Sequence, residues 1–154
     1  MKNKINTKPI DLPKRNNILF IATSVVFNLA VSGIYLSVKL DNPVALQWVG
    51  ALVIFLTIPF VITLIGYIRA KAPKMTLVRN GIVLGYILFE VMLDYILKIP
   101  FRDILWLHIV YIAALYAAIF SMIGIARRVS RQAGLLVFAA FLVLIGCLIY
   151  LFVG

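Results

Sequence analysis

Five long apolar runs, separated by short charged segments, restrict the folds that this chain can adopt. The runs cover residues 18–38, 44–68, 81–97, 104–126 and 133–153, and only the third contains acidic residues. A helix of about 20 residues crosses the roughly 30 Å hydrocarbon core of a bilayer and satisfies its own backbone hydrogen bonds there. The runs therefore predict a five-transmembrane-helix bundle, with helices at about 18–40, 44–69, 80–98, 103–127 and 132–153.

The composition supports an all-α integral membrane protein. Hydrophobic residues make up 64% of the 154 residues and charged residues only 13%, whereas soluble domains contain about 45–50% apolar and about 25% charged residues. A water-soluble fold of this size could not bury so much apolar surface. We expect residues 18–154 to form a single membrane domain, preceded by a basic, flexible cytoplasmic tail at 1–17.

The positions of lysine and arginine predict the orientation. Twelve of the fifteen cations lie before the first run, between the second and third, or between the fourth and fifth. These twelve are Lys2, Lys4, Lys8, Lys14, Arg15, Arg69, Lys71, Lys74, Arg79, Arg127, Arg128 and Arg131. Cytoplasmic loops retain positive charge during insertion, so the N-terminus is predicted in the cytoplasm and the C-terminus outside, in a multi-pass protein of the cell membrane. The alternation favours five spans over four.

The cationic face and the missing motifs limit the partners and cofactors. A net charge of +10 at the cytoplasmic side suits anionic lipid headgroups and requires no nucleic acid. The chain lacks a phosphate-binding loop, a dinucleotide glycine signature, H-E-x-x-H and C-x-x-C. Cys147 is the only cysteine and His108 the only histidine. We therefore expect no cofactor, and no residue is identified as catalytic.

The third run carries an unusual pair of acids. Glu90 and Asp94 are four residues apart, so both lie on one face of an α-helix. An acid near the bilayer centre costs about 2.5–3.5 kcal/mol, and such acids usually face the bundle interior. A hairpin centred near residue 101 would place Asp94 level with His108, and Glu90 near Tyr111. Glu90, Asp94, His108 and Tyr111 are therefore predicted to form an intramembrane polar site that relays protons or holds a cation.

Structural roles for the same acids stay open. Asp94 is spaced to pair with Lys98 at the membrane boundary, and such an interfacial ion pair contributes little. Glu90 could instead hydrogen-bond to a neighbouring helix and fix its packing. Pro59, inside the second run, removes a backbone hydrogen bond to Phe55 and predicts a bend that serves either as a hinge or as a static feature.

Three functional classes fit these observations. The first is an ion- or proton-coupled transport or channel protein centred on Glu90 and Asp94. The second, ranked nearly level, is a non-catalytic membrane subunit or interaction protein that docks another membrane protein or a second copy of itself. The third, ranked well behind, is an intramembrane enzyme with an unspecified metal held by Glu90, Asp94 and His108.

Overall fold

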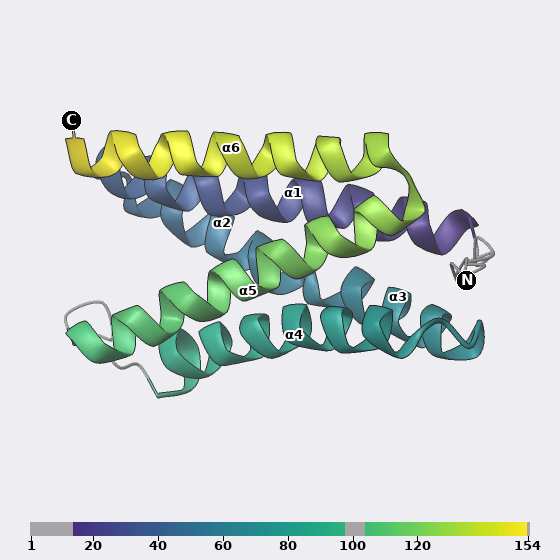
Figure 1. Cartoon of the computed structure of the whole chain (residues 1–154). Coiled ribbons are helices and arrows are strands. Elements are labelled where there is room, and N and C mark those ends of the chain that lie inside the picture. The colour runs from purple at the N-terminus through teal and green to yellow at the C-terminus, as the bar shows by residue number, and fades with distance from the viewer. Residues whose placement is uncertain (1–13, 98–103, 154) are drawn as a thin grey trace.

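The computed structural model describes residues 14–97 and 104–153, without the side chains of residues 94 and 95, and its regular structure there is entirely helical. The α-helices are α1 (Lys14–Lys39), α2 (Pro43–Phe55), α3 (Thr57–Arg69), α4 (Lys74–Val91), α5 (Leu105–Val129) and α6 (Arg131–Val153). A single π-helical turn, η1 (Met92–Ile96), continues α4. The all-α prediction is confirmed for these residues (Figure 1).

Within residues 14–97 and 104–153, four segments are long and apolar enough to cross a membrane, judged by length and composition. They are Lys14–Lys39, Pro43–Arg69, Leu105–Val129 and Arg131–Val153, and the second combines α2 with α3. The segment α4 is not among them, and it carries the charged residues Lys74, Arg79 and Glu90. The predicted span in the third apolar run therefore stays a prediction.

The helices run alternately between two ends of the bundle. In Figure 1, α1, α4 and α6 run from right to left, whereas α2, α3 and α5 run from left to right. The right-hand end, called the basic end below, carries Lys14, Arg15, Arg69, Lys71, Lys74, Arg127, Arg128 and Arg131. The other end, called the opposite end, holds the α1–α2 loop and the last residues of α6. The alternation of cations along the sequence thus becomes a separation in space.

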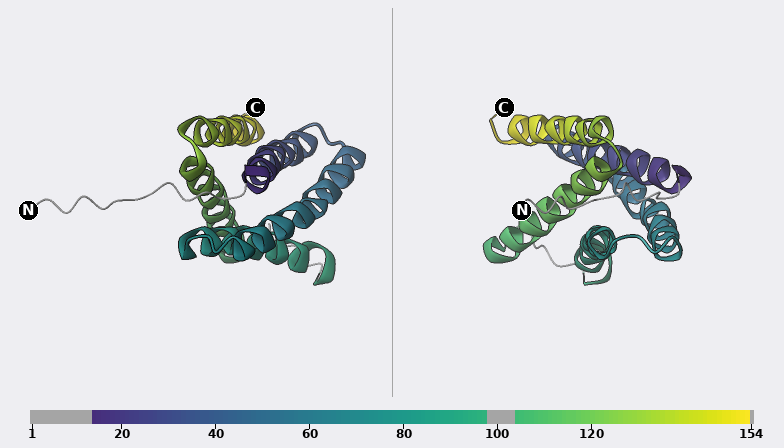
Figure 2. Two further views of the ribbon diagram at one scale, coloured as in Figure 1. Left: turned by 90° about the vertical axis from the view of Figure 1, so that its right-hand side faces the viewer. Right: turned by 45° about the vertical axis from the view of Figure 1, so that its right-hand side comes forward.

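The helices form a ring in sequence order. Helix α1 packs against α2, α3, α5 and α6, and α4 packs against α3 and α5. Figure 2 (left) shows this ring from the basic end. Because α6 returns to α1, the first and last helices close the ring, and side chains from α1, α3, α4 and α5 share one interior.

The turn between α1 and α2 ends one helix and caps the next. The N–H of Asn42 donates to the carbonyl of Ser37 at 3.0 Å, and Asp41 adopts a left-handed φ of 49°. This pattern is a Schellman motif, which satisfies the last carbonyls of a helix. Asn42 then caps α2 by accepting from the N–H of Ala45 at 3.0 Å, with Pro43 in the first turn. The Asp41-Asn42-Pro43 segment thus ends α1 and begins α2.

The second apolar run is broken where Pro59 predicts a bend. Helix α2 ends at Phe55, Leu56 separates the two helices, and α3 begins at Thr57. Pro59 has no N–H to donate to the Phe55 carbonyl, so the hydrogen-bond ladder is interrupted at this point. The use of this break as a hinge stays a prediction.

Two helix starts differ clearly from the expected ones. Helix α1 begins at Lys14, so residues 14–17 are helical rather than part of the tail. Helix α4 begins at Lys74 rather than near residue 80, and it places Arg79 inside the helix instead of in a loop. Lysine and arginine are good helix formers, so a helix can extend beyond its apolar run.

A column of aromatic rings fills the interior. The rings follow the order Tyr67, Phe20, Phe60, Phe27, Tyr86 and Tyr111, and consecutive centroids lie 5.6 to 6.2 Å apart. All six side chains are buried. They come from α1, α3, α4 and α5, so the column joins these helices along the length of the bundle.

The surface is unusually apolar, and several polar side chains are buried among the apolar ones of the interior. Large apolar side chains such as Phe55 (68% exposed), Trp106 (66%) and Phe120 (58%) face outward. Polar side chains such as Ser24, Asn28 and Asn80 are fully buried. Soluble proteins place these residue types the other way round. This polarity is expected of a bundle whose solvent is itself apolar.

Candidate functional site

Glu90 lies in a buried hydrogen-bonded group that joins α4 to α5. Its side chain is 7% exposed. The hydroxyl of Tyr111 donates to Glu90 Oε1 at 3.1 Å, and the hydroxyl of Tyr86 donates to the Tyr111 hydroxyl at 2.8 Å. Tyr86 lies one helical turn before Glu90, so both project from the same face of α4. These three residues are called the Glu90 cluster.

The order of donors in the Glu90 cluster suits proton movement. A phenol hydroxyl can accept one hydrogen bond and donate another, so two successive hydroxyls that end on a carboxylate form a relay. The rings of Tyr86 and Tyr111 also pack with centroids 5.7 Å apart, which limits the movement of both hydroxyls. The carboxyl group can therefore gain or lose a proton while the relay keeps its geometry.

A cavity at the opposite end reaches the Glu90 cluster through Tyr111. The cavity has a volume of about 270 Å³ and lies between α1, α5 and α6. It is lined by Val31, Ile34, Tyr35, Val38, His108, Tyr111, Leu151 and Phe152. Tyr111 therefore both lines the cavity and hydrogen-bonds to Glu90. We call this space the Tyr111 cavity.

Of the four residues predicted to form the polar site, the structure brings some together and not others. Glu90 and Tyr111 are hydrogen-bonded, as matching their depths suggested. His108 lines the Tyr111 cavity, and its buried Nδ1 atom has no hydrogen-bond partner within the described part of the chain. It therefore neighbours the Glu90 cluster without being hydrogen-bonded into it.

Asp94 lies in the π-helical turn η1. The prediction that Asp94 shares a face with Glu90 assumed an uninterrupted α-helix, and a π-turn changes the angle between successive residues. That assumption was wrong. The Asp94 side chain lies outside the described residues, as does Lys98. Among the described side chains, His, Cys, Asp and Glu form no group of three that could hold a metal ion.

Two buried amides, Asn28 on α1 and Asn80 on α4, were not predicted from the sequence. The amide nitrogen of Asn80 on α4 donates to the Thr63 hydroxyl on α3 at 3.2 Å, and Asn28 on α1 donates to the Ser24 carbonyl at 2.8 Å. The Oδ1 atoms of Asn28 and Asn80 are buried without a hydrogen-bond partner in the described structure. An uncharged amide next to or inside an apolar run was the signal, because buried polar groups usually face other helices.

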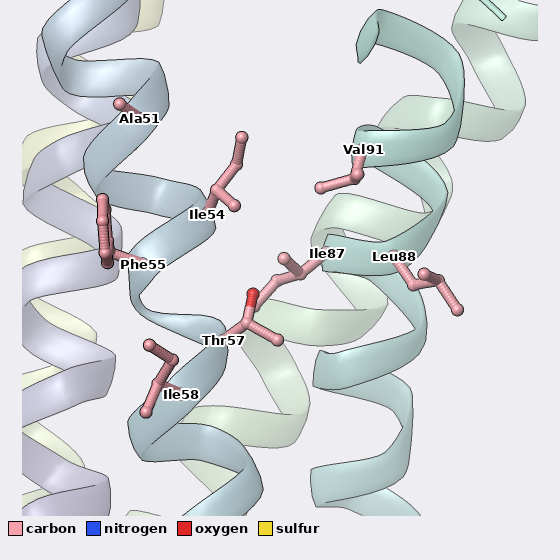
Figure 3. Close-up of a pocket in the computed structure, with 8 residues that line it drawn as sticks. All are labelled: Ala51, Ile54, Phe55, Thr57, Ile58, Ile87, Leu88 and Val91. Carbon is pink, nitrogen blue, oxygen red and sulfur yellow. The ribbon is translucent and has the colours of Figure 1, made fainter. Parts of the chain in front are cut away.

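The break between α2 and α3 opens an apolar cleft toward α4. Its volume is about 520 Å³. Figure 3 shows Ile54 and Thr57 facing Ile87 and Val91 across the space. The other lining residues are Ala51, Phe55, Ile58 and Leu88, so the Thr57 hydroxyl is the single polar group among the lining side chains. We call this surface the lateral cleft.

Comparison with known proteins gives no match: neither a family model, nor a curated protein, nor a solved structure is similar to this chain. The function must therefore be argued from the geometry of its own residues.

Proposed function

We propose that this chain is a five-span protein of the cell membrane with a cytoplasmic N-terminus. It transports protons or small cations by way of the Glu90 cluster. The outward-facing apolar side chains and the buried amides support insertion, because they match an apolar solvent. The cations gathered at the basic end support the orientation, because cytoplasmic segments retain lysine and arginine.

Helix α4 supplies the fifth crossing. It has 18 residues, η1 adds five more, and together they run between the same two ends as α1 and α6 (Figure 1). At 1.5 Å per residue, about 20 residues match the hydrocarbon core. Glu90 is buried against Tyr111 rather than facing outward, so its charge does not contact lipid.

The transport proposal rests on Tyr111, which both lines the Tyr111 cavity and donates a hydrogen bond to Glu90. A proton that enters the Tyr111 cavity reaches Glu90 through the Tyr111 hydroxyl. Toward the basic end, Phe27 and Phe60 fill the interior, so release on that side requires the helices to move. The α2–α3 break gives such a movement a place to occur. A gated carrier fits this arrangement better than an open channel.

The test is flux in reconstituted liposomes under a pH or cation gradient. Glu90→Gln removes the titratable group at nearly constant shape, and we expect it to lower the flux about tenfold or more. Asp41→Asn is the matched control, because it makes the same change at an exposed turn and should leave the flux within about twofold. Equal flux in the wild type and in a folded Glu90→Gln protein rejects the proposal.

Topology is tested separately with tags inserted after residues 40 and 100. Both tags should be accessible from outside intact cells. Cytosolic tags, or a chain that stays soluble without detergent, would contradict the membrane proposal itself.

The lateral cleft favours a second function, that of a membrane subunit that docks another membrane protein. Its lining includes exposed apolar side chains, among them Phe55 (68% exposed) and Leu88 (60%), and such patches are typical of interaction sites. This function predicts a stoichiometric partner after purification in mild detergent, and Leu88→Trp should release it by filling the cleft. A monomer that supports Glu90-dependent flux would instead favour transport.

A further inference from the structure

A second cavity, called the arginine cavity below, lies at the basic end between α5 and α6. Its volume is about 300 Å³, and it is lined by Ile123, Arg127, Arg131, Gly134, Leu135 and Phe138. Arg131, Leu135 and Phe138 are spaced four and three residues apart on α6, so they follow one face of that helix away from the basic end. Ile123 lies one turn from Arg127 on α5. The arginine cavity is therefore charged where it meets the basic end and apolar along its length.

The two arginines have no acidic partner in the described structure. The acidic side chains that the structure describes are Asp41 in the α1–α2 loop and Glu90 near the end of α4, and both lie toward the opposite end. Arg127 and Arg131 are both exposed. Their charge is thus available to an anion from outside the bundle.

Close packing of the hairpin holds the two arginines at one cavity. A Cβ atom at Gly134 would lie 2.9 Å from Arg127 Cβ and 3.0 Å from Arg127 Cα, so only glycine permits this approach of α6 to α5. The Ser130 hydroxyl accepts from the N–H of Ala133 at 3.0 Å and caps α6 within the same turn. The arginine cavity is therefore built by the backbone of the hairpin, not by chance proximity of long side chains.

We propose that the arginine cavity binds one anionic phospholipid, with its phosphate between Arg127 and Arg131 and an acyl chain along Leu135 and Phe138. Guanidinium groups bind phosphate oxygens through paired, charge-assisted hydrogen bonds. The apolar walls distinguish a lipid from free phosphate, because only a lipid covers them. This inference rests on the proposed membrane insertion but not on the proposed transport.

Native mass spectrometry of the full chain in mild detergent tests the proposal. The probes are phosphatidylglycerol, phosphatidylcholine and inorganic phosphate. We expect one phosphatidylglycerol to bind, and Arg127→Gln/Arg131→Gln to weaken it about 30-fold or more, since two charge-assisted contacts are lost. The matched control, Lys74→Gln/Arg128→Gln, removes the same charge at the same end but outside the cavity, and it should weaken binding at least several-fold less.

Three other outcomes would reject the arginine cavity as a binding site for an anionic lipid. Equal losses in the two double variants would mean diffuse attraction by the basic end. Equal binding of phosphatidylcholine would mean that no anion is recognised, and displacement by inorganic phosphate would identify a soluble ligand. If the glutamine variant does not fold, Phe138→Trp provides the second test, because it narrows the apolar part and should also release the lipid. Failure of the tag experiment would instead remove the membrane premise.

Discussion

The Glu90 cluster and the arginine cavity hold charge in opposite ways. Glu90 is buried, and neutral hydroxyls of the bundle itself hydrogen-bond to it. Arg127 and Arg131 are exposed, and the described structure offers them no carboxylate. A buried charge needs hydrogen-bond partners inside the fold because water cannot reach it, whereas an exposed charge can bind an external ion. Charged side chains therefore form part of the fold at the Glu90 cluster, whereas at the arginine cavity they are available to bind an external ion.

Charge reversal at the two places gives the largest expected contrast. Glu90→Lys would put an ammonium group where Tyr111 now donates to a carboxylate, and an unpaired buried charge costs about 3–5 kcal/mol of unfolding free energy. Arg127→Glu reverses an exposed charge, so we expect a change within about 0.5 kcal/mol. Denaturant unfolding in detergent measures both. Similar losses would show that burial does not separate the two regions.

The packing behind the arginine cavity gives the second contrast. Gly134→Ala adds a methyl group against the backbone of Arg127, whereas Gly146→Ala on the same helix adds one with no neighbour within 4 Å. Both substitutions gain the same helix propensity. We therefore expect Gly134→Ala to be about 1–3 kcal/mol less stable than Gly146→Ala, as is typical of overpacking. Equal unfolding free energies would contradict the tight α5–α6 contact.

The order of hydrogen bonds within the Glu90 cluster gives the smallest expected difference in unfolding free energy. Tyr111→Phe removes the acceptor of Tyr86 and the donor to Glu90, and we expect it to cost about 1–2 kcal/mol. Tyr86→Phe removes the bond to Tyr111 and leaves the bond from Tyr111 to Glu90 in place, so about 0.5–1.5 kcal/mol is expected. Thermal unfolding of both variants in one detergent checks the order. A more damaging Tyr86→Phe would mean that Tyr111 is not the central member.

Local chemistry explains which features were predictable. The Asp41-Asn42-Pro43 turn follows from capping preferences of single residues, and the break near Pro59 follows from a missing N–H. Counting residues back from one corner placed Glu90 and Tyr111 at similar depth, although it did not determine that their side chains touch. Each of these needs only the chain itself or one pair of neighbouring helices.

Other features needed the whole bundle. The π-turn at Met92–Ile96 and the start of α4 at Lys74 place Asp94 and Arg79 differently from what the sequence predicted. Arg79 now approaches α5, since a Cβ atom at Gly124 would lie 2.5 Å from its Nη1 atom. The pairing of Asn80 with Thr63 joins helices through a contact that no spacing in the sequence indicates.

The sequence alone determined the helical class, the apolar character of the outer surface and the collection of cations at alternate turns. These follow from composition and order, because an apolar run must satisfy its backbone within its own helix. Only the tertiary structure decided that Tyr86 and Tyr111 meet Glu90, and that Gly134 brings Arg127 and Arg131 to one cavity. The rotation of each helix about its axis selects these partners, and that rotation is set by side-chain packing among several helices at once.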